Sequence, residues 1–219
     1  MLTFKELGVS PDLLRGIEEL GFQTPTPIQE EIIPLFFDCE NDIVGLAQTG
    51  TGKTAAFGLP IIDQCDTNST TVQSLILSPT RELCIQIAKD LENYAKYVKG
   101  LRVTPIYGGA SIDLQIRDLK RGTQIIVATP GRMLDMIKRK RANITEIRTV
   151  ILDEADEMLN MGFRDELDAI LEQTPKEKRT LLFSATMPNE VARIANTYMH
   201  DPIKISVGKE NSGAENVKH

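Results

Sequence analysis

Short, unbroken runs of apolar and β-branched residues recur along this chain, separated by stretches with helical periodicity. Leu75–Leu77, Ile125–Val127 and Val150–Leu152 show no alternation of polar and apolar residues. Such strands are typical of a parallel sheet that is covered on both faces. We therefore expect an α/β fold, a doubly wound, mostly parallel sheet with helices on both faces. The predicted strands span residues 42–47, 74–78, 102–107, 124–128, 149–153, 180–184 and 203–207.

Helical periodicity is clearest at Glu82–Val98, Pro130–Lys140 and Asn189–Met199. The first forty residues predict two helices joined by the proline-rich turn Thr24–Pro27. Gly208–His219 contains almost no apolar residue, so it is expected to be a linker or tail after a single domain of residues 1–207. In a doubly wound fold, ligands bind at the carboxyl ends of the strands. The search for chemistry therefore starts there.

Composition excludes several classes of protein. The formal charge of the 219 residues is −6, which excludes a globally basic nucleic-acid binder but not a local basic face. Three widely spaced cysteines and two histidines make a disulfide framework, a zinc site and histidine-based catalysis improbable, and they fit the reducing cytoplasm. Neither a signal peptide nor an apolar run of about 18 residues is present, so we expect no membrane partner.

A phosphate-binding loop is predicted at Ala47–Thr54, between a predicted strand and a predicted helix. Glycines let backbone N–H groups turn toward phosphate oxygens, and the following helix N-terminus adds positive potential. Lys53 should reach the β- and γ-phosphates, while the Thr54 hydroxyl should ligate Mg²⁺. The candidate nucleotide-binding residues here are Ala47, Gln48, Thr49, Gly50, Thr51, Gly52, Lys53 and Thr54.

A carboxylate pair, Asp153 and Glu154, directly follows the buried-type run Thr149–Leu152. Asp153 would hold the metal, through water, because Mg²⁺ dehydrates reluctantly. Glu154 would polarise or deprotonate the attacking water, which favours hydrolysis over transfer to a metabolite. The alternative for the pair alone is an acidic helix start that suits the helix dipole.

The full stretch Asp153-Glu154-Ala155-Asp156 closely resembles the signature of the DEAD-box RNA helicases of superfamily 2. The resemblance extends from Phe4 to about Val207, with seven motifs in the order of the family. It implies a RecA-like ATP-binding domain of an ATP-dependent RNA helicase, with ATP and Mg²⁺ as cofactors. It also implies a second α/β domain with an arginine finger, which nothing after Val207 supplies.

An adenine-recognition motif is implied by the same resemblance at Pro25–Gln29, with Phe22 and Thr24 just before it and Phe4 as the isolated upstream aromatic residue. Gln29 would hydrogen-bond the adenine edge, and its alternative is a solvated helix position. Phe4 would stack on the ring, and its alternative is to anchor the first helix in the core. The sequence leaves open whether Phe4 or Phe22 packs on adenine.

Ser184-Ala185-Thr186 resembles the family motif that contacts the stretch Asp153–Asp156, here called the acidic box, and that couples hydrolysis to RNA remodelling. Ser184 and Thr186 therefore join Lys53, Asp153 and Glu154 as catalytic candidates. Three further segments, 79–83, 108–109 and 129–132, each follow a predicted strand and resemble the RNA-facing motifs of the family. They supply helix N-terminal N–H groups, a hydroxyl or an arginine, and such groups hold sugar and phosphate without reading base sequence. The RNA-binding candidates are Pro79, Thr80, Arg81, Gly108, Gly109, Thr129, Pro130, Gly131 and Arg132.

Residues 117–148 contain nine Lys and Arg residues against three acidic ones. This stretch is interpreted either as a basic flank beside the RNA track or as a solvated helix end at Lys138–Arg141. With few aromatic residues, RNA binding should rest on the backbone, be independent of sequence and weaken with salt.

The chain by itself is expected to be a monomer that binds ATP or ADP but hydrolyses ATP slowly, with little stimulation by RNA. Two other functions stay open, a P-loop small-molecule kinase and a nucleotide-gated RNA-binding module without significant catalysis. A DNA helicase of the same superfamily is less favoured, since the adenine motif and the full acidic box match the RNA group.

Overall fold

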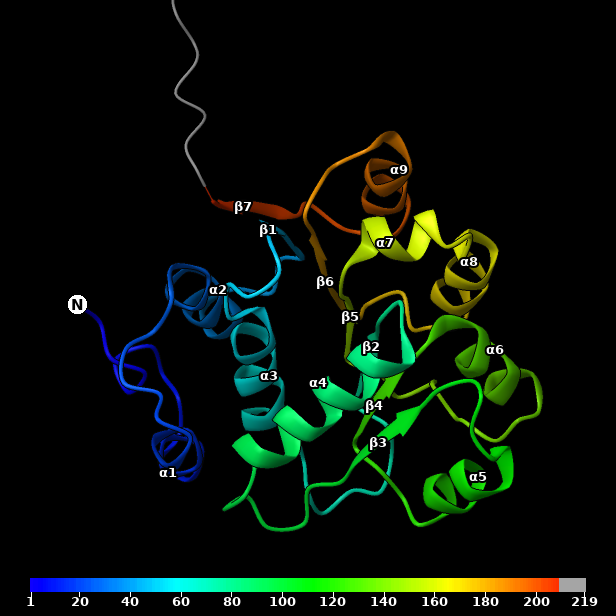
Figure 1. The fold of residues 1–219 in the computed structure, drawn as a ribbon, viewed down its shortest axis with the longest axis horizontal. Coiled ribbons are helices and arrows are strands. Elements are labelled where there is room, and N and C mark those ends of the chain that lie inside the picture. The colour runs from blue at the N-terminus through cyan, green and yellow to red at the C-terminus, as the bar shows by residue number, and fades with distance from the viewer. Residues whose placement is uncertain (209–219) are drawn as a thin grey trace, which may run out of the picture.

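A seven-stranded parallel sheet forms the centre of the computed structural model, which describes residues 1–208 (Figure 1). The strands are β1 (Ile43–Ala47), β2 (Ser74–Leu77), β3 (Val103–Ile106), β4 (Ile125–Ala128), β5 (Thr149–Leu152), β6 (Arg179–Ser184) and β7 (Ile203–Val207). The helices are α1 (Pro11–Glu19), α2 (Pro27–Asp38), α3 (Lys53–Asp63), α4 (Arg81–Tyr94), α5 (Ile112–Lys120), α6 (Pro130–Lys138), α7 (Ala155–Asn160), α8 (Arg164–Gln173) and α9 (Asn189–Tyr198). Among residues 1–208, no helix is both long and apolar enough to cross a membrane.

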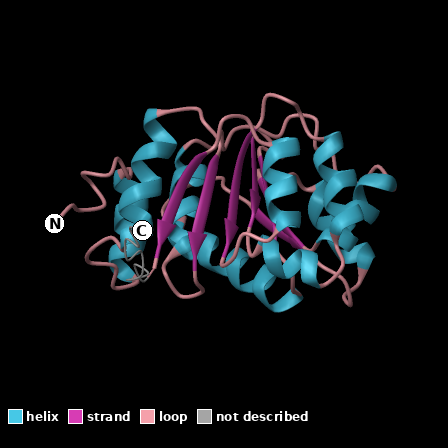
Figure 2. Ribbon diagram, turned by 90° about the horizontal axis from the view of Figure 1, so that it is seen from above, coloured by secondary structure: helices cyan, strands magenta, loops and turns pink. Residues whose placement is uncertain are grey.

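Helices cover both faces of the sheet, as the unbroken apolar strands predicted (Figure 2). Along β5, Ile151 faces the cluster packed by α1–α4, whereas Val150 and Leu152 face the cluster packed by α6–α9. Each strand therefore needs apolar side chains on both sides, which is why no polar alternation occurs. The predicted fold class is confirmed, and every paired strand is parallel.

The strand order is β3-β4-β2-β5-β6-β1-β7. Because all strands point the same way, the loops after β1, β2, β3, β4, β5 and β6 meet at one edge of the sheet, the carboxyl edge. The predicted phosphate loop, acidic box and three RNA-facing segments all follow strands, so the topology places them along this edge. The loops that precede the strands form the opposite, amino edge.

Helix boundaries differ from the sequence predictions in a few places. The helix predicted to end at Val98 ends at Tyr94, where turns bring the chain back toward β3. The helix predicted to end at Lys140 ends at Lys138, and Lys140 adopts a left-handed backbone with φ of 55°. Helices α5 and α8 were not predicted. Of the predicted tail, all residues after Gly208 lie outside the described residues.

Asp42 fixes the amino edge near β1. Its side chain is buried, and its two carboxylate oxygens accept hydrogen bonds from the backbone N–H groups of Thr180 and His200, each at 2.7 Å. These bonds join β1 to the start of β6 and to the approach of β7. A buried carboxylate that satisfies two backbone donors is costly to remove, because both donors lose their partner.

We predict that Asp42→Ala lowers the free energy of unfolding by about 2–4 kcal/mol, since the buried Thr180 N–H and the part-buried His200 N–H lose their acceptor. The exposed Asp38, changed to Ala, is the matched control and should shift stability by less than about 0.5 kcal/mol. Urea unfolding followed by circular dichroism measures both. Equal losses in the two variants would contradict this account of Asp42.

Candidate active site

The predicted phosphate loop connects β1 directly to α3. Gly50 and Gly52 have φ angles of 81° and 90°, a left-handed region that glycine adopts without strain. Gln48, Thr49 and Gly50 are exposed, and the Thr51 hydroxyl donates to the carbonyl oxygen of Gln48 at 2.8 Å. Within residues 1–208, no side chain caps the first turn of α3, which starts at Lys53. The helix N-terminus is therefore free to receive an anion.

Lys53 and Asp153 meet at the carboxyl edge although a hundred positions separate them in the chain. The Lys53 Nζ atom lies 3.4 Å from an Asp153 carboxylate oxygen, and both side chains are buried. Burial raises the pKa of Asp153, and the positive charge of Lys53 opposes that rise. The pair thus places one buried cation and one buried anion between the phosphate loop after β1 and the end of β5.

Glu154 occupies the next position with a left-handed backbone, φ 51° and ψ 53°, which is unusual for a residue with a side chain. Its carboxylate accepts a hydrogen bond from the Thr49 hydroxyl at 3.5 Å. Burial raises the pKa of Glu154, the charge of Asp153 raises it further, and Lys53 acts in the opposite sense. A glutamate with a raised pKa is suited to accept a proton near neutral pH.

Ser184 and Thr186 contact the acidic box through Asp156. The Ser184 hydroxyl, fully buried at the end of β6, accepts a hydrogen bond from the Asp156 N–H at 3.3 Å. The Asp156 carboxylate accepts bonds from the Thr186 hydroxyl at 2.9 Å and from its N–H at 3.1 Å. The predicted link between the two motifs is present.

Gln29 joins the adenine-type motif to the phosphate loop. Its Oε1 atom accepts from the Thr26 N–H at 2.9 Å, and its Nε2 atom donates to the Gly52 carbonyl oxygen at 3.1 Å. Gln29 is buried, so its alternative interpretation as a solvated helix position is wrong. One amide N–H and one oxygen lone pair are left over for a ligand.

Phe4 is 4 % exposed and belongs to the core cluster packed by α1–α4. Its ring centroid lies 6.0 Å from that of Phe22, and Phe22 also packs edge-on against Tyr94 at 5.8 Å. Phe22 is half-buried and Thr24 is exposed. The packing agrees with the anchoring alternative for Phe4, and its contact with adenine stays a prediction.

The RNA-binding candidates occupy the other half of the carboxyl edge, after β2, β4 and β3. Thr80 caps α4 by accepting a hydrogen bond from the Leu83 N–H at 3.2 Å. Arg132 donates to the Ala110 carbonyl oxygen at 3.2 Å, so the loops after β4 and β3 are tied together. Arg81 stacks over Tyr107 at 5.1 Å, beside Gly109. The remaining candidates are Pro79, Gly108, Thr129, Pro130 and Gly131.

The basic stretch does not form a flank beside these candidates. Helices α5 and α6 start at the carboxyl edge and run back, so Arg121 and Lys138–Arg141 lie at the amino edge, as does Arg148 before β5. Only Arg132 of the whole stretch is part of the candidate RNA set. The interpretation as a basic flank is wrong, because a helix that starts at the carboxyl edge ends at the amino edge. The basic residues at the ends of α5 and α6 therefore lie away from these candidates.

Two residues near the site were missing from the sequence prediction. Asp156 was recognised only as a letter of the motif, although its carboxylate receives both Thr186 bonds. Ser78 is fully buried, and its hydroxyl has no hydrogen-bond partner among the described residues. The register that pairs Leu77 with Leu152 places Ser78 beside Asp153. The sequence signal that could have identified Ser78 was a serine directly after the apolar run Leu75–Leu77.

The oxygen donors around Lys53 fit a magnesium ion that binds together with a nucleotide. Asp153 supplies a carboxylate and Thr54, half-buried at the start of α3, supplies a hydroxyl. Within residues 1–208, no three His, Cys, Asp or Glu side chains form a metal cluster. Mg²⁺ does not need one, because it binds through one or two protein ligands, waters and substrate phosphates.

A family model, curated relatives and a solved structure all match this chain. The DEAD/DEAH box helicase family model matches residues 26–194. A DEAD-box ATP-dependent RNA helicase CshA of Bacillus cereus is 50% identical over 218 residues, which is 100% of this chain and 41% of that protein. The ATP-dependent RNA helicase DeaD of Haemophilus influenzae is 47% identical over 213 residues, 96% of this chain and 35% of that protein.

A solved structure, that of a DEAD box protein from the hyperthermophile Methanococcus jannaschii, superimposes with a TM-score of 0.90 at 47% identity. It covers 94% of this chain and 56% of the other. The chain therefore spans about two fifths of the length of the first curated relatives and about half of this structural neighbour.

Gly52 and Gly50 provide a matched pair of substitutions in the phosphate loop. A Cβ atom at Gly52 would lie 2.6 Å from Gln29 Nε2 and 2.8 Å from Thr26 Oγ1, whereas at Gly50 no atom of the described residues lies within 4 Å. We predict that Gly52→Ala separates α2 from the loop and weakens binding of a fluorescent ADP analogue by about tenfold or more, about 1.4 kcal/mol. Gly50→Ala brings only the backbone strain of a positive φ, about 1 kcal/mol.

Fluorescence titration of both variants, with thermal unfolding as the check on folding, measures the difference. Nucleotide affinities that fall equally in the two variants would contradict the role assigned to the Gln29–Gly52 contact.

Proposed function

Because this chain belongs to the DEAD/DEAH box helicase family, we propose that it is the ATP-binding domain of an ATP-dependent RNA helicase. The convergence of Lys53, Asp153 and Glu154 beside the phosphate loop is the observation that carries the proposal. The matched relatives are named ATP-dependent RNA helicases, which supports ATP as the nucleotide and RNA as the polymer.

The nucleotide would bind with its phosphates on the loop 47–54 and its adenine near Gln29. Loop N–H groups and the N-terminus of α3 would hold the phosphate oxygens. Lys53 would leave Asp153 and turn to the β- and γ-phosphates, where its charge is neutralised by the ligand instead. Phe4, Phe22 and Thr24 would border the base, with Phe22 the more accessible of the two rings.

Asp153 and Thr54 would hold Mg²⁺, which when bound neutralises charge on the phosphate oxygens. Glu154 would accept a proton from the attacking water and keep that water oriented. Its left-handed backbone aims the carboxylate toward Thr49, across the mouth of the phosphate loop. Hydrolysis therefore needs Glu154 ionised, whereas nucleotide binding does not.

RNA would lie along the other half of the carboxyl edge. Arg81, Thr80, Gly108, Gly109 and the segment 129–132 would contact its backbone without reading sequence. Asp156, Ser184 and Thr186 stand between the two halves, because β5 and β6 lie between β2 and β1. Hydrolysis and RNA contact would be coupled through them.

We further propose that the longer protein brings a second α/β domain whose arginine finger completes the site. The relatives extend well beyond the matched region, which supports a longer protein. Three free cysteines support a reducing compartment such as the cytoplasm. A monomer is proposed for the chain in solution.

The raised pKa of Glu154 gives a pH prediction. Because the reaction needs the ionised carboxylate, a raised pKa moves the acidic limb of the rate profile to higher pH than an ordinary glutamate with a pKa of 4.5 would give. In single-turnover hydrolysis at excess protein, the rate should fall with decreasing pH, and Glu154→Gln should lose hydrolysis while still binding ATP. An unchanged rate in Glu154→Gln would contradict the role of Glu154 as the base.

Steady-state ATP hydrolysis with and without single-stranded RNA tests the whole proposal. We predict nucleotide binding, slow turnover and little stimulation by RNA, because an arginine finger contributes roughly 10³-fold or more. Strong RNA-stimulated turnover by residues 1–219 alone would contradict the two-domain account. Phosphate transfer to a metabolite, independent of RNA, would instead identify a kinase.

A further inference from the structure

The loop 66–73 at the amino edge is rich in hydroxyl groups and is held by hydrogen bonds with buried side chains. Gln73 and Gln124, both more than nine-tenths buried, hold it by accepting from the Asp66 N–H at 2.9 Å and donating to the Ser69 carbonyl oxygen at 2.7 Å, respectively. The Thr123 N–H also donates to the Thr70 carbonyl oxygen at 3.3 Å. The loop therefore presents its threonines in a fixed position.

Four exposed arginines from different segments of the chain surround this loop. Arg102 and Arg121 line one hollow of about 310 Å³ with Thr67 and Thr70. Arg141 lines a second, adjoining hollow of about 190 Å³ that also contains Thr70. Arg148 donates to the side-chain oxygen of Gln73 at 3.1 Å. Both hollows are lined by Thr70, so they lie side by side, and together they are called the groove around Thr70. Glu146 and the apolar residues Val72, Leu119 and Ala142 also line the second hollow.

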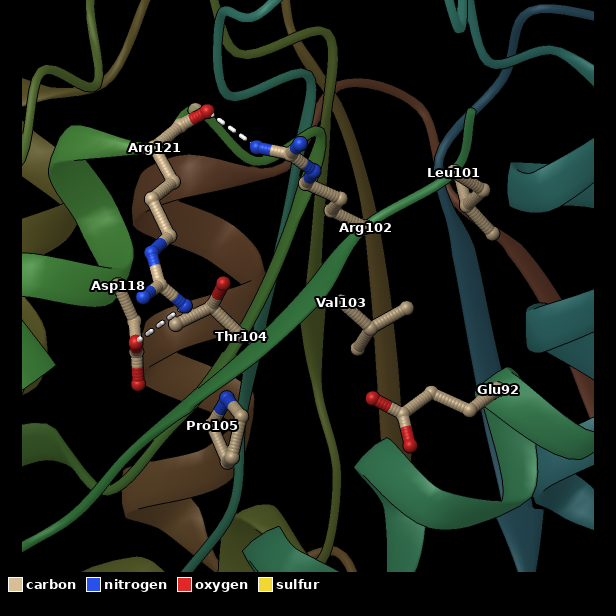
Figure 3. Close-up of a pocket in the computed structure, with 9 residues that line it drawn as sticks. Glu92, Leu101, Arg102, Val103, Thr104, Pro105, Asp118 and Arg121 are labelled. Carbon is tan, nitrogen blue, oxygen red and sulfur yellow. Dashed lines mark hydrogen bonds and ion pairs between the residues drawn. The ribbon is translucent and has the colours of Figure 1, made fainter. Parts of the chain in front are cut away.

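The arginines keep most of their hydrogen-bonding capacity. Figure 3 shows the Arg102 guanidinium donating to the Arg121 carbonyl oxygen, and Arg121 facing Asp118 at 3.7 Å. A guanidinium has five N–H donors, so one such contact leaves several for a ligand. Arg102, Arg121 and Arg141 are all exposed.

The surrounding surface is positive although the whole chain is acidic. Nine exposed cations stand on the amino-edge segments near the loop, against the carboxylates of Asp66, Glu92, Asp118, Asp135 and Glu146. Two of those carboxylates, Asp118 and Asp135, are already in ion pairs with Arg121 and Arg139. The cations are Arg102, Arg117, Lys120, Arg121, Lys138, Arg139, Lys140, Arg141 and Arg148. Further along the same edge, Glu40 and Glu177 line a hollow together with Arg148.

We propose that the groove around Thr70, bordered by Arg102, Arg121 and Arg141, is a second binding site for the phosphodiester backbone of single-stranded RNA. It lies at the amino edge, opposite the nucleotide site and the RNA-binding candidates. Guanidinium groups pair with phosphate in a bidentate manner, and threonine hydroxyls donate to phosphate or sugar oxygens. Among residues 1–208, no aromatic side chain lines either hollow, and the arginines and threonines outnumber the one carboxylate, Glu146, so the groove favours a phosphodiester backbone over a base.

RNA binding at this groove requires no bound nucleotide, in contrast to the ATP-dependent activity proposed for the carboxyl edge. Its position opposite Lys53 and Asp153 means that RNA bound here does not compete for the carboxyl edge. In the longer protein, such a site would keep one RNA molecule attached while the carboxyl edge releases and rebinds it, and the effective local concentration of RNA would rise.

Binding of a fluorescein-labelled twelve-nucleotide oligouridine to the nucleotide-free chain tests the proposal. The test variant carries Arg102→Glu, Arg121→Glu and Arg141→Glu. The control carries Lys5→Glu, Lys89→Glu and Lys204→Glu, which are exposed elsewhere and change the net charge equally. We expect the test variant to bind about tenfold or more weakly, with a smaller salt dependence, and the control to change far less.

A neutral variant with Arg102→Gln, Arg121→Gln and Arg141→Gln covers the case in which the charge reversal unfolds the chain, as circular dichroism would reveal. Equal loss in test and control variants would overturn the site, since only net charge would then matter. Unchanged RNA binding together with lost binding of polyglutamate would also overturn it in favour of an acidic protein partner. Failure of nucleotide binding in the ATP experiments would leave this result unaffected.

Discussion

The ion pair between Lys53 and Asp153 is the interaction on which the site depends. It joins the start of α3 to the end of β5 across the parallel sheet, and it holds two opposite charges in a buried position. Neither charge would be tolerated there alone, because burial of an unpaired ion is strongly unfavourable. A ligand that carries both anionic phosphates and a cation can pair with each residue separately. Its phosphates can then neutralise Lys53, and its cation can neutralise Asp153.

The sheet topology places this pair among the other candidate residues of the carboxyl edge. The phosphate loop follows β1 and the acidic box follows β5, while β6 lies between them, ends at Ser184 and is followed by Thr186. Asp156 contacts both residues, because its N–H donates to the Ser184 hydroxyl and its carboxylate accepts two hydrogen bonds from Thr186. The RNA-binding candidates begin one strand further along, after β2. The proposed nucleotide site and the RNA-binding candidates therefore lie at neighbouring strand ends.

Much of this arrangement could be predicted from the sequence, because strands covered on both faces must be apolar and ligand loops follow them. The seven strands and the meeting of Lys53 with Asp153 follow from that rule. The basic flank did not, since charge counts along the chain ignore that α6 returns to the opposite edge. Burial of Gln29 and the unpartnered hydroxyl of Ser78 depend on tertiary contacts that no local pattern records.

The central claim is that Lys53 and Asp153 jointly receive one nucleotide–metal complex. A crystal structure of the chain with a non-hydrolysable ATP analogue and Mn²⁺, with the metal located by its anomalous signal, tests it most directly. We predict a manganese peak next to the Asp153 carboxylate, directly or through one water, with Lys53 on the phosphates. A nucleotide and metal bound elsewhere, with the Lys53–Asp153 pair still at 3.4 Å, would contradict the account.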